Sequence, residues 1–83
     1  MTDRNNYLAQ RLRQIRENAG FSQRGLAAAI EMPIWRVQRA EQATGLLSDT
    51  EIRRWAYGCN AGDQESELIQ LWVSSLPKVV YEA

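Results

Sequence analysis

The residues with the greatest capacity for chemistry lie in the segment 34–42, which reads Ile-Trp-Arg-Val-Gln-Arg-Ala-Glu-Gln. Val37 and Ala40 stand three residues apart, as apolar positions of a helix do, and helical geometry then directs Arg36 and Arg39 away from the core. An outward arginine can donate two hydrogen bonds to O6 and N7 of a guanine, with about 1–3 kcal/mol of discrimination against other bases. The segment therefore predicts a surface that could read base edges in the major groove of DNA.

Ile34 and Trp35 give this surface a second interpretation. Their side chains cannot hydrogen-bond a base as Asn or Gln does, although they can pack on a thymine methyl group. Trp35 could instead belong to the core, or it could anchor a partner protein, because tryptophan is enriched in interface hot spots. The two arginines could likewise form an ordinary solvated face. A protein-interaction module that docks a partner protein through Ile34 and Trp35 is therefore the alternative to DNA binding.

Enzymatic and metal chemistry find little support in the sequence. The 83 residues include no histidine, which removes the commonest general base and metal ligand. Cys59 is the sole cysteine, so it can form neither a disulfide within the chain nor a zinc cage, and we expect it to be a small packed residue. The carboxylates are scattered, and no glycine-rich phosphate loop is present. We expect no enzyme, no metal and no cofactor.

The side chains of segment 34–42 can be positioned only by a folded domain, and a chain of 83 residues is long enough for one small domain. Apolar periodicity over the 83 residues predicts five short helices followed by a tail. In the first helix, Asn5 or Asn6 is expected to cap the start, and Gly20 supplies the left-handed residue after the end. The inward face of this helix is expected to carry Leu8, Leu12, Ile15 and Ala19.

The second and third helices are separated by a turn of only three residues. Ser22 is a candidate N-cap for a helix from Gln23 to about Ile30, and Pro33 fixes the backbone for the first turn of the next helix. Two helices joined in this way form a helix-turn-helix, whose second helix enters the major groove. Ala27 supplies the small residue that a steep crossing needs, and the contact is completed by Leu26, Ile30, Val37 and Ala40.

Two further helices complete the expected domain. Ser48 and Glu51 have the spacing of a capping box at the start of the fourth helix, and Asp63 is expected to cap the fifth. The fold class expected is all-α: a five-helix bundle over residues 1–76, followed by a short extended C-terminal tail, 77–83, of strand-like composition. The inward faces of the last two helices are expected to carry Ile52, Trp55, Ala56, Leu68, Leu71 and Trp72.

Four segments taken together carry a family resemblance: Leu12-Arg13-Gln14-Ile15-Arg16, Gly20-Phe21-Ser22-Gln23, Leu26-Ala27 and Val37-Gln38-Arg39-Ala40-Glu41. They resemble the xenobiotic-response-element type of helix-turn-helix, the Cro-like and phage-repressor-like group, over about residues 8–72. Two later runs resemble the fourth-helix region of actinobacterial members, Leu47-Ser48-Asp49 and Tyr57-Gly58. The resemblance implies a lambda-repressor-like domain with its helix-turn-helix at 23–42, and a sequence-specific transcriptional regulator, most often a repressor.

The resemblance also implies roles for single residues. Gln23 matches a glutamine that opens the second helix and reaches the DNA backbone and flanking bases. Arg16 and Glu41 match a buried ion pair that ties the first helix to the third. With the outward positions of the recognition helix added, the expected DNA-binding residues are Gln23, Arg24, Ile34, Trp35, Arg36, Gln38 and Arg39.

The turn departs from the family pattern at two positions. Relatives usually have glycine where this chain has Glu31. A left-handed glutamate would cost about 1–2 kcal/mol, so we expect the turn to be reshaped. Relatives usually have Ser or Thr where Pro33 stands, so one hydroxyl that contacts phosphate is missing.

The net charge is zero, but the charges are unevenly distributed. Residues 1–54 carry nine Arg and six acidic residues, a net charge of +3, whereas residues 55–83 carry one Lys and four acidic residues, a net charge of −3. The basic half suits DNA, and we expect the acidic half to support a weak or DNA-assisted homodimer. Candidate dimer contacts are Trp72, Val73, Val79, Val80 and Tyr81.

No apolar run in the sequence approaches the length of a membrane span. The longest, 26–30, has five residues, whereas a spanning helix needs about 20. We therefore expect a cytoplasmic protein with no membrane partner.

Overall fold

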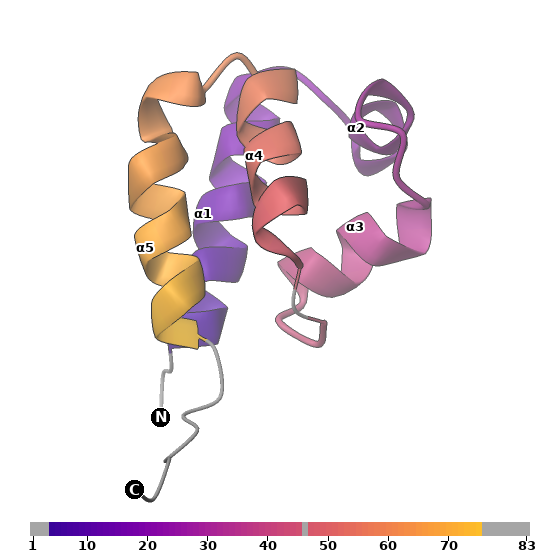
Figure 1. Cartoon of the computed structure of the whole chain (residues 1–83). Coiled ribbons are helices and arrows are strands. Elements are labelled where there is room, and N and C mark those ends of the chain that lie inside the picture. The colour runs from indigo at the N-terminus through magenta and orange to yellow at the C-terminus, as the bar shows by residue number, and fades with distance from the viewer. Residues whose placement is uncertain (1–3, 46, 76–83) are drawn as a thin grey trace, which may run out of the picture.

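The computed structural model describes residues 4–45 and 47–75, with the side chains described from Asn6 onward. Five α-helices and one short 3₁₀ helix make up this part of the chain (Figure 1). In chain order they are α1 (Arg4–Asn18), α2 (Gln23–Ala29), α3 (Ile34–Glu41), α4 (Asp49–Gly58), the 3₁₀ helix η1 (Gly62–Gln64) and α5 (Glu65–Ser75). The described residues contain no strand, so the all-α prediction with five helices is confirmed. The expected extended tail, 77–83, lies outside the described residues.

The helices form two groups around a shared core. Figure 1 shows α1, α4 and α5 side by side, with α2 and α3 on the other side of α4 from α5. Contacts of α2 with α4 and of α3 with α1 join the two groups. The pair α2–α3 is therefore held from behind by two helices, which leaves its far side open to solvent.

Every α-helix contributes to the core. Its largest fully buried side chains are Trp55, Leu12, Leu26, Ile52, Leu68 and Val37. Buried tryptophans usually need a partner for the indole N–H, and Trp55 Nε1 donates to the carbonyl of Leu12 at 3.0 Å. This bond fixes α4 against the middle of α1.

The predicted N-cap residues were right at two helices and wrong at two. Ser22 accepts a hydrogen bond from the N–H of Gly25 at 2.9 Å, and Ser48 forms the predicted capping box with Glu51. The predicted asparagine cap is wrong, because α1 begins at Arg4 and both asparagines are helical. The predicted cap at Asp63 is wrong too. That residue lies inside η1, whose tight first turn is closed by Gln64 N–H donating to the carbonyl of Ala61 at 2.9 Å.

The end of α1 is set by Gly20. Its φ of +84° is left-handed, as predicted. Leu8, Leu12 and Ile15 are buried as expected, whereas Ala19 is exposed and was wrongly placed on the buried face. The helix ends at Asn18, so Ala19 no longer follows the direction of the helical face.

Glu31 keeps the left-handed conformation of the turn. Its φ is +56°, although the residue is not glycine, so the expected reshaping of the turn is wrong. Met32 N–H donates to the carbonyl of Ala27 at 2.9 Å and closes the end of α2 around this residue. Burial of Ile30 and Met32 on either side of Glu31 holds the strained residue in place.

Candidate nucleic-acid interface

The α2–α3 pair has the geometry of a helix-turn-helix. Leu26 and Val37 are fully buried between the two helices, and Ala27 and Ala40 are nearly so. A side chain as short as that of Ala27 suits a close crossing of α2 and α3. The side chains of α3 that are not buried against α2 lie on the opposite, outer side of the helix.

Arg16 and Glu41 join α1 to the end of α3. Arg16 Nε lies 2.5 Å from Glu41 Oε2, and a second guanidinium nitrogen donates to Glu41 Oε1 at 3.0 Å. The remaining nitrogen donates to the carbonyl of Phe21 at 2.8 Å. The two side chains are only 9% and 4% exposed. Hydrogen bonding to Glu41 raises the pKa of Arg16 despite the opposing effect of burial.

Gln23 belongs to the same buried network. Its Nε2 donates to Glu41 Oε1 at 3.1 Å, so one carboxylate binds both Arg16 and the first residue of α2. An amide side chain has two N–H donors and an acceptor oxygen. Gln23 therefore keeps a donor and the acceptor for other contacts. Arg24, the next residue, is exposed.

Arg36 differs from its expected outward orientation. It is half-buried, and its Nε and one terminal nitrogen donate to the two oxygens of Glu51 at 2.5 and 2.7 Å. This pair connects α3 to the start of α4. Hydrogen bonding within the pair raises the pKa of Arg36 and lowers that of Glu51. Periodicity defined one inward direction for α3, but the fold also brings Glu51, in the first turn of α4, within reach of the Arg36 side chain.

Trp35, Gln38 and Arg39 form the exposed face of α3, called here the outer face. Trp35 is 50% exposed and therefore lies outside the core. Gln38 and Arg39 are exposed as well. The Arg39 guanidinium carbon lies 5.3 Å from the centroid of the Trp35 ring, within the range of a cation–π interaction. Ile34 is half-buried and packs against the core.

The arginines fall into two groups according to their partners. Among the described side chains, ion pairs with carboxylates involve Arg11, Arg13, Arg16, Arg36 and Arg53. Within the same part of the chain, no carboxylate lies within ion-pair distance of Arg24, Arg39 and Arg54. Among the described side chains, the positive charge without a carboxylate partner is thus carried by one exposed residue on each of α2, α3 and α4.

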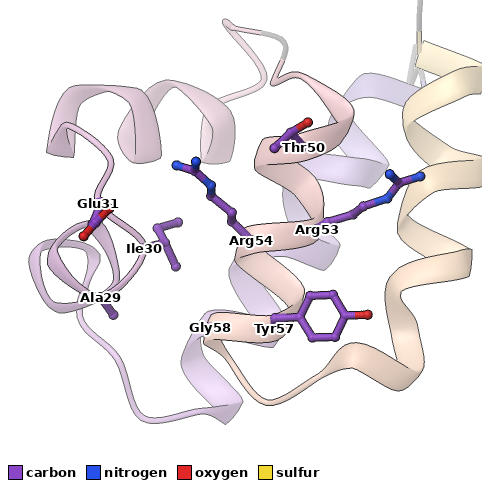
Figure 2. A pocket seen from close by; sticks show the side chains of 8 residues that line it. All are labelled: Ala29, Ile30, Glu31, Thr50, Arg53, Arg54, Tyr57 and Gly58. Carbon is purple, nitrogen blue, oxygen red and sulfur yellow. The ribbon is translucent and has the colours of Figure 1, made fainter.

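A groove between α2 and α4 was not predicted from the sequence. It has a volume of about 540 Å³ and is lined by Ala29, Ile30, Glu31, Thr50, Arg53, Arg54, Tyr57 and Gly58 (Figure 2). Figure 2 shows Arg54 extending from α4 toward the α2–α3 pair, whereas Arg53 extends toward α5, where it pairs with Glu65. Of these two arginines, only Arg54 is without a carboxylate partner among the described residues.

The candidate dimer residues are only partly described. Trp72 is half-buried against the core, and its indole N–H donates to the carbonyl of Leu47. Val73 is 53% exposed on α5. Three further candidates lie outside the described residues: Val79, Val80 and Tyr81. No described helix is long and apolar enough to cross a membrane.

The fold and the outer face together define a helix-turn-helix domain. A family model described as a helix-turn-helix domain matches residues 7–69, and the chain belongs to this family. The comparison with curated proteins gave no significant match, and neither did the comparison with solved structures. Membership in a helix-turn-helix family indicates a DNA-binding domain with a role in transcription regulation.

Proposed function

We propose that the domain binds a specific double-stranded DNA half-site with α3 in the major groove. The observation that carries this proposal is the outer face, where Arg39 combines exposure with the lack of a carboxylate partner among the described residues. Trp35 and Gln38 flank it on the same face. Gln23 and Arg24, at the start of α2, are suited to contact phosphates and set the docking position.

In this proposal Arg36 has a positioning role. Its guanidinium binds Glu51 through two hydrogen bonds, so reaching a base would break a pair that connects α3 to α4. Ile34 likewise supports the helix from its half-buried position and offers only its exposed part to a thymine methyl group. Direct base contacts therefore fall to Arg39 and Gln38, and Trp35 lies beside Arg39 on the same face.

The finer assignment is a repressor of the xenobiotic-response-element, Cro-like group. The Gly-Phe-Ser-Gln run and the Glu at the end of α3 support it, because Arg16, Gln23 and Glu41 of these motifs form one network. Such a regulator acts in the cytoplasm by occupying an operator and blocking or recruiting the transcription machinery. Two copies bind adjacent half-sites as a weak or DNA-assisted homodimer, in which exposed Val73 is a candidate contact.

Selection from a random DNA library, followed by titration of the recovered site, tests the proposal. We expect an enriched half-site and an affinity that falls steeply with salt. Arg39→Ala should relax specificity at one base position. Arg13→Ala removes the same charge from α1, where the side chain pairs with Glu17, and should leave specificity unchanged. Failure to enrich any sequence, together with binding that is insensitive to salt, would contradict the proposal.

A protein-interaction module remains a second candidate because Trp35 is half exposed. Exposed tryptophans are common anchors of protein interfaces. Trp35→Ala distinguishes the two functions. If the variant loses a protein partner and keeps full affinity and specificity for DNA, Trp35 serves the protein interface instead of the DNA interface.

A further inference from the structure

The side chain of Arg39 is confined on two sides before any ligand binds. On one side the guanidinium lies against the Trp35 ring, with 5.3 Å between the guanidinium carbon and the ring centroid. On the other side the loop after α3 comes close: a Cβ added to Gly45 would lie 3.3 Å from Arg39 Cβ and 3.9 Å from Cδ. The stem of Arg39 therefore lies between the Trp35 ring and the backbone of this loop, although the side chain is exposed to solvent.

The loop is held against the same residue through the backbone. Thr44 donates to the carbonyl of Arg39 twice, from its N–H at 3.0 Å and from its hydroxyl at 3.3 Å. Gly45 follows directly, so these bonds keep it beside the Arg39 stem. The confinement thus comes from two separate parts of the chain, Trp35 one helical turn earlier and the loop immediately after α3.

An Arg39 side chain held in one position favours a contact with strict geometry, such as two hydrogen bonds to a base, over a charge interaction with a phosphate. Arginine has many rotamers, and ordering them on binding costs free energy that a pre-positioned side chain has already lost. The guanidinium carbon lies over the Trp35 ring, and no carboxylate of the described residues is within ion-pair distance of Arg39, so its N–H groups can make the two bonds to guanine O6 and N7. Phosphate binding would gain less, because a phosphate can be approached from many directions.

We propose that Trp35 is a positioning residue that holds Arg39 for bidentate recognition of a guanine in the half-site. This inference rests on the proposed function. It adds that the base read by Arg39 is a guanine and that Trp35 acts indirectly, by positioning Arg39. Trp35 then contributes to specificity through Arg39, whereas a direct contact of Trp35 with a thymine would act independently of Arg39.

The test measures guanine preference in four proteins: the wild type, Trp35→Leu, Arg39→Met and the double variant. Each guanine of the selected half-site is replaced in turn by 7-deazaguanine, which lacks the N7 acceptor but keeps its base pair. In the wild type, one replacement should weaken binding about five- to tenfold. Trp35→Leu should reduce this preference about two- to fivefold, the value of an exposed cation–π interaction, and leave non-specific binding unchanged.

Two controls separate positioning from a loss of structure. Leucine is a good helix former at this exposed site, so Trp35→Leu should retain its thermal midpoint, and Trp35→Phe should keep part of the guanine preference. In the free protein, the Arg39 Nε–H resonance should be shifted upfield by the ring current of Trp35 and should lose this shift in Trp35→Leu. Gln38→Ala, on the same face, should leave that resonance in place.

The double variant decides the outcome. If Trp35→Leu has no further effect once Arg39 is methionine, the two residues act as a unit and the proposal holds. An equal loss with and without Arg39 means that Trp35 makes its own contact, which overturns it. Sequence-specific binding without any sensitivity to 7-deazaguanine also overturns it while leaving the proposed function intact, and only the absence of specific binding removes both.

Discussion

Arg36 and Glu51 connect the recognition helix to the helix that follows it. Glu51 accepts two hydrogen bonds from the Arg36 guanidinium, at 2.5 and 2.7 Å, and its Oε1 also accepts the backbone N–H of Ser48 at 2.8 Å. One carboxylate therefore completes the capping box of α4 and fixes the flank of α3. Arg36 precedes the loop between the two helices and Glu51 follows it, so their ion pair links the two ends of the segment that places Gly45 beside Arg39.

Removing Arg36 should loosen this connection at modest cost in stability. The pair is partly exposed, with side-chain exposures of 34% and 21%, so we expect Arg36→Met to lower the free energy of unfolding by only about 1 kcal/mol. We also expect a clear loss of DNA specificity despite the small change in stability, because α3 would be less firmly oriented. Urea unfolding and half-site titration check the two effects. A loss of specificity equal to that of Arg39→Ala would instead indicate that Arg36 reads a base itself.

Acid should weaken the same connection. Hydrogen bonding to Arg36 lowers the pKa of Glu51 in the folded state below its ordinary value of 4.5. The stabilisation is therefore fully present above that value and is lost as the pH falls through the lower, folded-state pKa. Urea midpoints measured between pH 7 and pH 3 should fall more for the wild type than for Glu51→Gln. Parallel pH profiles for the two proteins would exclude Glu51 as a source of acid sensitivity.

Breaking the Arg16–Glu41 pair should be far more damaging. The two side chains are nearly buried, so Glu41→Leu leaves the Arg16 charge without its partner and should cost about 3–5 kcal/mol. It also removes the acceptor of the Gln23 bond. The double variant Arg16→Met with Glu41→Leu should recover much of this stability, because no isolated charge remains. Thermal unfolding of the three proteins measures the effect, and additive losses in the double variant would contradict it.

Cys59 should be unreactive in the folded protein. Burial raises the pKa of its thiol to about 11, and the side chain is 6% exposed, so almost no thiolate is present at pH 8. Alkylation by iodoacetamide at pH 8 should be slow in buffer and fast in denaturing urea, with the difference following the degree of unfolding. Rapid alkylation of the native protein would show that the end of α4 opens readily.

The fold was predictable from the sequence wherever a local signal coincided with the packing. Apolar spacing predicted all five helices, and the serine caps at 22 and 48 are where expected. The wrong caps at Asn5, Asn6 and Asp63 have one cause: a residue that can cap a helix is also accepted within its first turns. The sequence alone does not show whether a turn of helix precedes such a residue.

The candidate interface was less predictable because it depends on contacts between helices. Helical geometry directed Arg36 outward, but the tertiary fold places Glu51, in the first turn of α4, within reach of its guanidinium. The stack of Arg39 on Trp35 is compatible with their spacing of four residues and was still not predicted. Periodicity separates inward from outward positions, whereas the partner of an outward side chain depends on which helix lies alongside.

Glu31 offers a way to stabilise the domain without touching the outer face. Its φ of +56° disfavours any residue with a Cβ other than Asn or Asp, by about 1–2 kcal/mol. Glu31→Gly removes this conformational cost, but glycine also has more freedom in the unfolded chain, which offsets part of the gain. We therefore expect Glu31→Gly to raise the free energy of unfolding by about 0.5–1 kcal/mol. Glu31→Asn should give a smaller gain, and Ala28→Gly, inside α2, should lower stability by about 1 kcal/mol. Urea unfolding ranks the variants, and a destabilised Glu31→Gly would mean that the glutamate side chain makes a stabilising interaction in the turn.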